Sequence, residues 1–298
     1  MYTVAINGAG GFIGRNLAKY FLEKGHKVYG IDINEKGMIE LLNYQHFVSI
    51  CTNDKKINEV IKEQIDVYYH LAWGGSLLSK DLQNIDLQLS NIKMSIDYLD
   101  QMIKIGVKKV IFCGSSYQYM VHNDTGLKTS YYGLAKDMTL NLYADYCRRN
   151  NIKFNGVLLT NTYGYGDYST KAVNTLISKM ENGESLLLVE GKYQNDWVYI
   201  DDTVRGLYLV FKSGLNFESY YIGNIKISTF KEKIICMKSI LNYDKKLVFG
   251  EYPENTHVDY TLLDANKTLV DTGFSCEVTF EEGIKKTAEW LKVKEKVQ

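Results

Sequence analysis

The stretch YTVAINGAGGFIGR, residues 2–15, decides the fold. It contains the apolar run 4–6, whose lack of polar alternation predicts a strand buried on both faces. Gly8, Gly11 and Gly14 follow, and apolar residues then recur at helical period. Glycine lets the backbone turn and approach a ligand, and a helix N-terminus offers unpaired N–H groups and partial positive charge. A strand, a glycine turn and a helix in this order therefore predict a binding place for a pyrophosphate.

A second apolar segment, residues 28–31, ends at Asp32. A carboxylate at this point can accept hydrogen bonds from both hydroxyls of an adenine ribose, and it repels a 2′-phosphate. Asp32 therefore favours NAD as cofactor, although Arg15 and Lys36 could receive a phosphate and leave NADP as an alternative. The competing interpretation is an ordinary glycine-rich turn followed by an aspartate that caps a loop.

The bulk composition narrows the class of protein. The chain has 298 residues, is 45% hydrophobic and has a formal net charge of zero. This balance argues against a nucleic-acid partner, and the lack of a long apolar run argues against a membrane span. The first strand starts at the N-terminus, so we expect no signal peptide. The five cysteines are scattered and show no metal-binding spacing, which predicts reduced thiols, no metal site and a cytoplasmic protein.

Three further strands are expected at residues 46–50, 67–72 and 107–112, each after a helical segment. A long helix is expected at residues 83–105, before the last of these strands. Strands that alternate with helices predict an α/β fold, in which helices cover both faces of a parallel sheet. His70 lies inside the apolar fourth strand, so we expect a packed core histidine and not a catalytic one.

Asp54 follows the third strand and has two interpretations that the sequence leaves equal. Its carboxylate could hydrogen-bond an adenine amino group, or it could cap the helix that begins near Lys55.

A second group of polar residues suggests catalysis. The fifth strand runs into Ser115, and hydroxyls at the carboxyl end of such a strand face the ligand crevice. Tyr132 and Lys136 are one helical turn apart, so both project from one face. An ammonium and a bound nicotinamide cation favour the phenolate, which lets Tyr132 exchange a proton with a sugar or ketone oxygen. Ser115 would hydrogen-bond that oxygen, and Lys136 would hold the nicotinamide ribose. The alternative for the Tyr132/Lys136 pair is a solvated surface face.

The motifs match one family over nearly the whole chain. The sequence resembles the extended short-chain dehydrogenase/reductases, the NAD-dependent epimerase/dehydratase family, which act on nucleotide-activated sugars. The matching segments are the glycine turn, Asp32, the HLA segment 70–72, Asn91, the GSS strand end, the YGLAK helix, and residues 161–166, 196–202 and 221–223. The resemblance implies a Rossmann-type doubly wound parallel sheet with a smaller C-terminal substrate-binding lobe.

The roles that this family assigns can be carried over position by position. The resemblance implies catalytic roles for Ser115, Tyr132 and Lys136. Besides Tyr132 and Lys136, the residues expected at the cofactor are Gly8, Gly11, Phe12, Ile13, Gly14, Asp32, Asp54, Leu71, Ala72 and Asn91. The residues expected at the substrate are Ser116, Asn161 and Asn195.

Two arginines that are common in the family are missing. Most relatives carry an arginine that grips the substrate diphosphate where this chain has Asn195, and another where it has Leu158. Either the substrate carries less phosphate or another cation replaces them. The candidates are Lys171, Lys179 and Lys192.

The resemblance leaves three functions open. Dehydratases of the family follow the catalytic hydroxyl with Asp-Glu, whereas this chain has Ser116 and Tyr117, so dehydration is disfavoured. The first hypothesis is an oxidoreductase that reduces the 4-keto group of a nucleotide-activated deoxysugar, with a tyrosine as proton donor. The second is an NAD-dependent nucleotide-sugar 4-epimerase, and the third is a non-catalytic NAD(H)-binding regulator. The intact set of Ser115, Tyr132 and Lys136 argues against the third.

The expected organisation follows from the same resemblance. We expect an NAD(P)-binding Rossmann domain at residues 1–165 and a substrate-binding region at 166–298 that is partly interwoven with the sheet. A homodimer is expected through the two long helices, residues 83–105 and 133–148.

Overall fold

A computed structural model describes residues 1–52, 57–75, 79–122, 125–128, 130–254 and 256–295. Its centre is a seven-stranded sheet whose neighbouring strands all pair in parallel. The strand order is β12 (Ser219–Ile222), β7 (Lys153–Leu159), β5 (Lys109–Ser115), β4 (Val67–His70), β1 (Thr3–Asn7), β2 (Lys27–Asp32) and β3 (Phe47–Cys51). The predicted α/β class with a parallel sheet is therefore confirmed.

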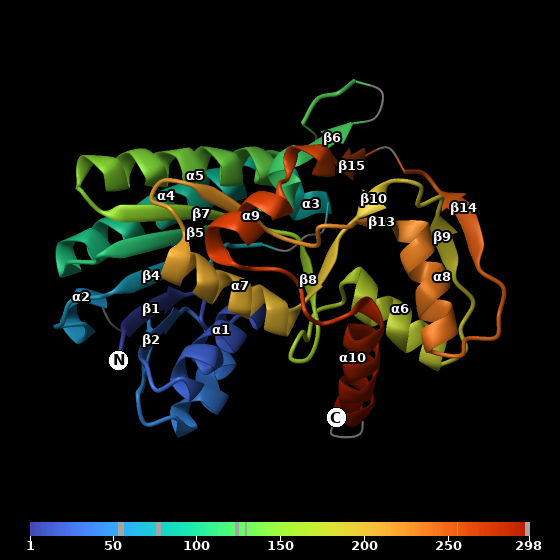
Figure 1. Cartoon of the computed structure of the whole chain (residues 1–298), viewed down its shortest axis with the longest axis horizontal. Helices are drawn as coiled ribbons and strands as arrows, with labels where there is room; N and C mark the ends of the chain where they lie inside the picture. The colour runs from blue at the N-terminus through green and yellow to red at the C-terminus, as the bar shows by residue number, and fades with distance from the viewer. Residues whose placement is uncertain (53–56, 76–78, 123–124, 129, 255, 296–298) are drawn as a thin grey trace.

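Helices cover both faces of this sheet (Figure 1). On one face, α1 (Phe12–Glu23) and α7 (Ile200–Ser213) contribute Phe21 and Leu207 to the larger hydrophobic core. On the other face, α4 (Ile85–Ile105) and α5 (Tyr131–Arg149) bury Leu99, Tyr143 and other side chains in a separate core. These two cores make the sheet doubly wound.

A smaller C-terminal region lies beside the carboxyl ends of the strands, at the right of Figure 1. Its main helices are α6 (Ala172–Glu181), α8 (Phe230–Ile240) and α10 (Phe280–Glu295). Its strand pairs are β8 (Asn161–Tyr163) with β11 (Trp197–Tyr199), β9 (Leu187–Val189) with β14 (Val248–Tyr252), and β10 (Gln194–Asn195) with β13 (Ser228–Thr229). Because β12 returns to the large sheet, the boundary at residues 165/166 stays a prediction.

Some local elements differ from what periodicity suggests. Residues after β2 form a 3₁₀ helix, η1 (Glu35–Asn43), instead of an α-helix, and its Gly37 backbone packs on the glycine turn. The long helix α4 starts at Ile85 because the Asn84 side chain caps the Leu87 N–H at 3.1 Å. The chain before it contains a separate turn, α3 (Ser79–Leu82). The remaining short elements are α2 (Ile57–Val60), η2 (Ser116–Tyr119), η3 (Tyr260–Leu262) and α9 (Ala265–Thr272).

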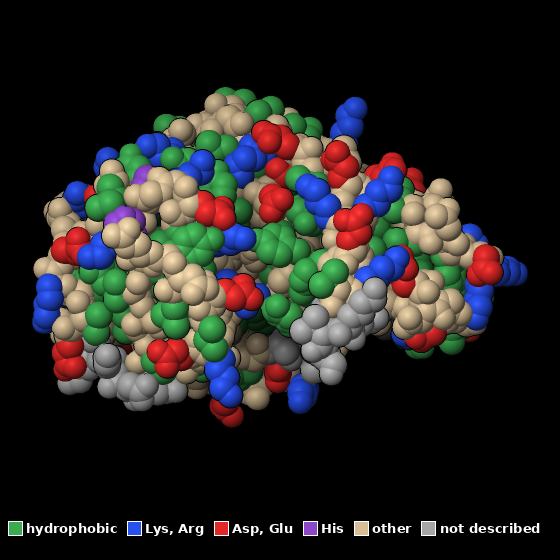
Figure 2. Space-filling model, turned by 90° about the horizontal axis from the view of Figure 1, so that it is seen from below, with side chains coloured by type: hydrophobic (Ala, Val, Ile, Leu, Met, Phe, Trp, Pro, Cys, Tyr) green, Lys and Arg blue, Asp and Glu red, His purple; other side chains and the backbone are tan. Residues whose placement is uncertain are grey.

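The segment after Ser115 also contains more structure than its polar composition suggests. Strand β6 (Met120–His122) pairs antiparallel with β15 (Thr256–Val258), which ties the segment to the C-terminal region. On the face in Figure 2, acidic and basic side chains are interspersed. Among the described residues, no helix is both long enough and apolar enough to cross a membrane.

Candidate active site

The glycine turn between β1 and α1 has room only for glycine at two positions. Gly8 has a φ of +85°, and a Cβ there would lie 2.7 Å from the Ala72 nitrogen. A Cβ on Gly14 would lie 2.0 Å from the Gly8 oxygen. The turn is therefore tight against both the following helix and the chain leaving β4, as a backbone cradle for a ligand requires.

The N-terminus of α1 suits an anion. Its N-cap is Gly11, with no side-chain cap and no acidic residue in the first turn. The amides of Phe12 and Ile13 belong to this first turn, and such N–H groups bind phosphate oxygens well. The residues predicted to hold a pyrophosphate thus fit it in both shape and charge.

Asp32 lies at the carboxyl end of β2, as predicted, and is also bonded within the protein. Its carboxylate accepts hydrogen bonds from the Gly10 N–H and the Asn34 N–H, both at 2.9 Å. Carboxylate oxygens have further lone pairs for ribose hydroxyls. The sequence did not indicate Gly10, whose role is visible only once the turn is folded onto β2. Asp54 lies outside the described residues.

Of the remaining predicted cofactor residues, two lie beside the glycine turn and one supports the loop after β4. Leu71 and Ala72 follow β4, and their N–H groups both donate to the Asn7 carbonyl, at 2.9 and 3.1 Å. These two hydrogen bonds keep the segment that leaves β4 beside the glycine turn. Asn91, which is buried, accepts from the Gly74 N–H at 2.7 Å and donates to the Gly74 carbonyl at 3.0 Å. Its amide therefore supports the loop after β4.

Ser115 and Tyr132 are brought together at the end of β5. The Ser115 side chain lies beside the Tyr132 hydroxyl, and Ser115 Oγ accepts a hydrogen bond from the Tyr117 N–H at 3.2 Å. Tyr132 keeps some exposed surface, but the surroundings of its hydroxyl are dense. This burial raises the pKa of Tyr132 to about 12, although the nearby Ser115 hydroxyl opposes the rise.

Lys136 lies one turn further along α5 and is buried. Its Nζ donates to the Cys113 carbonyl at 2.9 Å and lies 4.0 Å from the centre of the Trp73 ring. Burial lowers the pKa of Lys136 to about 7. The sequence predicted that the lysine would lower the pKa of Tyr132, but in the protein alone burial raises this pKa, so Tyr132 stays protonated. Trp73 was not predicted to contact the pair.

His70 is a packed residue, as predicted. It is fully buried in β4, and its ring nitrogens face the Tyr68 hydroxyl at 2.8 Å and Ser95 Oγ at 2.9 Å. Burial lowers its pKa well below the usual value. The neutral imidazole therefore links β4 to α4.

The predicted substrate residues lie on two separate parts of the site. Ser116 begins η2 and is buried. Asn161 and Asn195 lie together, because Asn161 is in register with Trp197 and its Nδ2 donates to the Asp196 carbonyl at 3.2 Å. Asn195 Oδ1 is buried without a hydrogen-bond partner among the described residues.

A buried carboxylate next to Asn195 organises this side of the site. Asp196 is fully buried and accepts hydrogen bonds from the Tyr221 hydroxyl at 2.5 Å and from Asn224 Nδ2 at 2.6 Å. The Asn224 N–H also donates to it, at 2.9 Å. The sequence pattern around residues 196–202 matched the family, but it gave no sign of these partners. We call Asp196, Tyr221 and Asn224 the Asp196 cluster.

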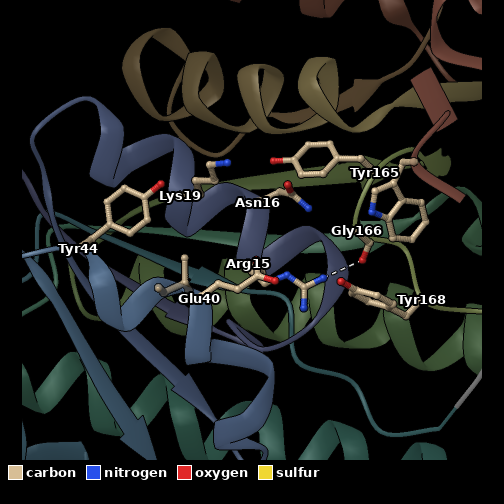
Figure 3. Close-up of a pocket in the computed structure, with 10 residues that line it drawn as sticks. Arg15, Asn16, Lys19, Glu40, Tyr44, Tyr165, Gly166 and Tyr168 are labelled. Atoms are coloured by element: carbon tan, nitrogen blue, oxygen red, sulfur yellow. Dashed lines mark hydrogen bonds between the residues drawn. The ribbon is translucent and has the colours of Figure 1, made fainter. Parts of the chain in front are cut away.

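A pocket of about 280 Å³ lies beside α1 (Figure 3). Its lining comes from α1, η1, the turn after β8 and α10. Inside it, Arg15 Nη2 donates to the Gly166 carbonyl at 2.7 Å, and the Arg15 guanidinium lies 5.3 Å from the centre of the Tyr168 ring. None of the residues predicted as catalytic lines this pocket.

Comparisons with known proteins agree with this geometry. The model of the NAD dependent epimerase/dehydratase family matches residues 4–223. The dTDP-4-dehydro-6-deoxyglucose reductase of Escherichia coli is 25% identical, with 98% of each chain covered. A CDP-abequose synthase of Yersinia pseudotuberculosis is 24% identical, covering 84% of this chain and 88% of that protein.

Solved structures show the same fold. The UDP-glucose 4-epimerase of Thermotoga maritima with UDP-glucose has a TM-score of 0.82 at 24% identity, covering 98% of this chain and 99% of that chain. The UDP-glucuronic acid 4-epimerase of Bacillus cereus in complex with NAD has a TM-score of 0.81 at 21% identity, covering 99% and 98%. The family match spans the glycine turn and the positions of Ser115, Tyr132 and Lys136, so the chain is an enzyme that belongs to the NAD-dependent epimerase/dehydratase family.

Proposed function

We propose that the protein reduces the 4-keto group of a nucleotide-activated deoxysugar. The observation that carries this proposal is the protonated Tyr132 hydroxyl, which lies beside the Ser115 side chain at the end of β5. A phenol with a pKa of about 12 is a proton donor near neutral pH. Reduction of a ketone needs such a donor at the oxygen that becomes a hydroxyl.

Each residue of the proposed catalytic set, Ser115, Tyr132 and Lys136, has a distinct task in this reaction. The bound nicotinamide supplies the hydride. Tyr132 gives its proton to the carbonyl oxygen, and the Ser115 hydroxyl orients that oxygen by a hydrogen bond. Lys136 orients the cofactor ribose, and its ammonium stabilises the phenolate that remains. Asp32 and the turn from Gly8 to Gly14 hold the dinucleotide.

Relatives support the reductase, and the chain disfavours dehydration. A 4-dehydro-6-deoxyglucose reductase and CDP-abequose synthases are similar over most of their length. Ser116 and Tyr117 carry neither a carboxylate nor a carboxylic acid with which to remove a hydroxyl. A 4-keto-6-deoxysugar nucleotide is thus the proposed substrate class.

A 4-epimerase is the second candidate, and Asp32 favours it. The carboxylate, bonded to Gly10 and Asn34, repels the 2′-phosphate of NADP and so favours NAD, the cofactor that a recycling epimerase holds. The same Ser115, Tyr132 and Lys136 can serve oxidation followed by reduction from the opposite side of the sugar.

One set of measurements separates the candidates. The purified protein is denatured, and the released nucleotide is identified by absorbance and mass. Separately, NADH or NADPH consumption is followed with dTDP- and CDP-linked 4-keto-6-deoxyglucose, and the products are assigned by NMR. An initially empty protein that oxidises NADH with a keto sugar supports the reductase. Stoichiometric bound NAD and interconversion of 4-epimers would support the epimerase instead. A protein that binds neither cofactor would contradict both.

We also propose that the enzyme is a homodimer that pairs through α4 and α5. Apolar side chains recur at helical spacing along α5 and are exposed, 40–55% for Tyr131, Leu134, Met138 and Leu142. Leu89 on α4 is 56% exposed. Met138→Glu should convert a dimer to a monomer in size-exclusion chromatography with light scattering. The control, Leu262→Glu, changes an exposed leucine in η3 and should leave the dimer intact. A wild-type monomer would contradict the proposal.

A further inference from the structure

Of the three lysines that the sequence left open as phosphate ligands, Lys171 lies at the glycine turn. Its Nζ is 5.6 Å from the centre of the Phe12 ring, and Phe12 is the first residue of α1. Lys192 instead pairs with Glu190 at 3.2 Å. Lys179 lies in the last turn of α6, at the opposite end from Lys171. Only Lys171 of these three is thus in contact with the first turn of α1 in the described structure.

The segment that carries Lys171 is fastened to α1. Arg15, from the first turns of α1, donates to the Gly166 carbonyl at 2.7 Å (Figure 3). One turn further on, Lys19 Nζ lies 5.7 Å from the centre of the Tyr165 ring. These contacts fix residues 164–168 on the helix, and Lys171 follows directly. The Lys171 ammonium therefore extends toward the first residue of α1 from a segment that is itself bonded to α1.

This contact joins two side chains that belong to the N-terminal ends of two helices. Lys171 is the N-cap of α6 and Phe12 begins α1, and both helices begin without a side-chain cap or an acidic first turn. By contrast, α4, α5, α8 and α9 each have a capping side chain. Helix α7 has Asp201 and Asp202 in its first turn. An anion at the first turn of α1 would satisfy amide donors there and would be attracted by the nearby Lys171 ammonium.

Lys171 is positioned and still accessible. The buried Asp167 carboxylate lies 3.7 Å from its Nζ and accepts a hydrogen bond from the Ser169 N–H at 3.1 Å. At 3.7 Å, the Asp167 carboxylate attracts the Lys171 ammonium but does not form a short hydrogen bond with it. The Lys171 side chain remains 41% exposed, so a ligand can reach it.

We propose that Lys171 binds a diphosphate group at the first turn of α1. The inference rests on the proposed function, which brings two such groups to the protein: that of the dinucleotide cofactor and that of the nucleotide sugar. The ammonium supplies positive charge that the neutral Asn195 does not. A lysine acts on phosphate as a point charge, so its contribution depends on charge and reach.

The test is ligand binding, measured without turnover. NADH is titrated by fluorescence, and dTDP or CDP, whichever the wild type binds more tightly, is titrated by calorimetry into NADH-loaded protein. Lys171→Met should weaken one of the two by about 10- to 100-fold and reduce its salt dependence. Lys171→Arg should stay within a few-fold of the wild type. Lys179→Met, a change on the same helix, should leave both affinities unchanged.

The ligand whose affinity falls in Lys171→Met identifies which diphosphate this lysine binds. Weaker NADH binding assigns Lys171 to the cofactor, and weaker nucleoside diphosphate binding with normal NADH binding assigns it to the sugar nucleotide. Unchanged affinity for both ligands in Lys171→Met would overturn the inference while leaving the proposed function intact. A wild-type protein that binds neither ligand would overturn the proposed function and, with it, this role of Lys171.

Discussion

The Tyr132/Lys136 pair, which we propose to be catalytic, and the Asp196 cluster are both buried polar groups, but their partners differ. Asp196 accepts three hydrogen bonds, from the Tyr221 hydroxyl and from two Asn224 groups. Among the described residues, Lys136 has a single carbonyl partner and aromatic surfaces around it, and burial lowers its pKa to about 7. A saturated buried group stabilises the fold, whereas an under-satisfied one keeps its capacity for a ligand. The difference separates a structural anchor from a reactive site.

The largest expected effect is a loss of enzymatic activity when the Tyr132/Lys136 pair is changed. Tyr132→Phe removes the proton donor, so the rate of keto-sugar reduction should fall by about 10²- to 10⁴-fold. Thermal stability should hardly change, because the phenylalanine ring keeps its packing against Trp73 and Tyr117. Steady-state kinetics and calorimetry check the two halves. A variant with wild-type activity would remove Tyr132 from the chemistry.

The matching substitution in the Asp196 cluster should lower the stability of the fold. Asp196→Ala leaves the Tyr221 hydroxyl and the Asn224 amide without their acceptor, and should lower the free energy of unfolding by about 3 kcal/mol or more. Tyr221→Phe, which removes a single donor, should have a smaller effect. Urea unfolding followed by tryptophan fluorescence measures both. Equal stability of Asp196→Ala and the wild type would show that the cluster is no anchor.

Lys136→Met should separate function from stability. Its pKa of about 7 in the folded protein is below the 10.5 of an ordinary lysine, so the unfolded chain binds the extra proton between these values. The cost of burying the ammonium is therefore fully present below about pH 7 and is relieved as the pH rises toward 10.5.

The Lys136→Met variant should be inactive but about 0.5–2 kcal/mol more stable than the wild type at pH 6. This gain in stability over the wild type should be smaller at pH 9. Urea midpoints at both pH values test this, and the difference between the two proteins cancels the titration of other groups. A variant that is less stable at pH 6 would mean that the Cys113 carbonyl bond outweighs the burial cost.

The smallest effect concerns His70. Its folded pKa is well below 6.5, so it stays neutral in the fold while the unfolded chain takes up a proton as the pH falls through 6.5. His70 should therefore subtract about 0.7 kcal/mol of stability between pH 7 and pH 6. The His70→Gln variant should show a correspondingly flatter pH profile of urea midpoints. An unchanged slope would indicate a protonated His70 in the fold.

The sequence predicted the parts of the molecule that follow from local pattern. Apolar runs located the first five strands of the sheet, and the glycine spacing located the turn. The packed state of His70 followed from its place inside an apolar run. Each of these features depends on residues that are close in the chain.

The remaining features depend on contacts between distant residues. That Asn91 lies near the cofactor stays a prediction, whereas its hydrogen bonds to Gly74, which only the fold brings near, were not indicated by the sequence. The pKa of Tyr132 depends on how densely the chain packs around its hydroxyl. The partners of Asp196 come from residues 221–224, whose distance from it in space no spacing rule gives.

The two backbone hydrogen bonds of Asp32 have a consequence for the evolution of this enzyme. To admit the extra phosphate of NADP, a descendant would have to lose this carboxylate, and with it the acceptor that joins Gly10 to Asn34. The loop would then need a substitute contact before the new cofactor could be used. Coenzyme choice is thereby coupled to loop integrity, so a single substitution at this position is a poor route, for natural selection or for an engineer, to an NADP-dependent form.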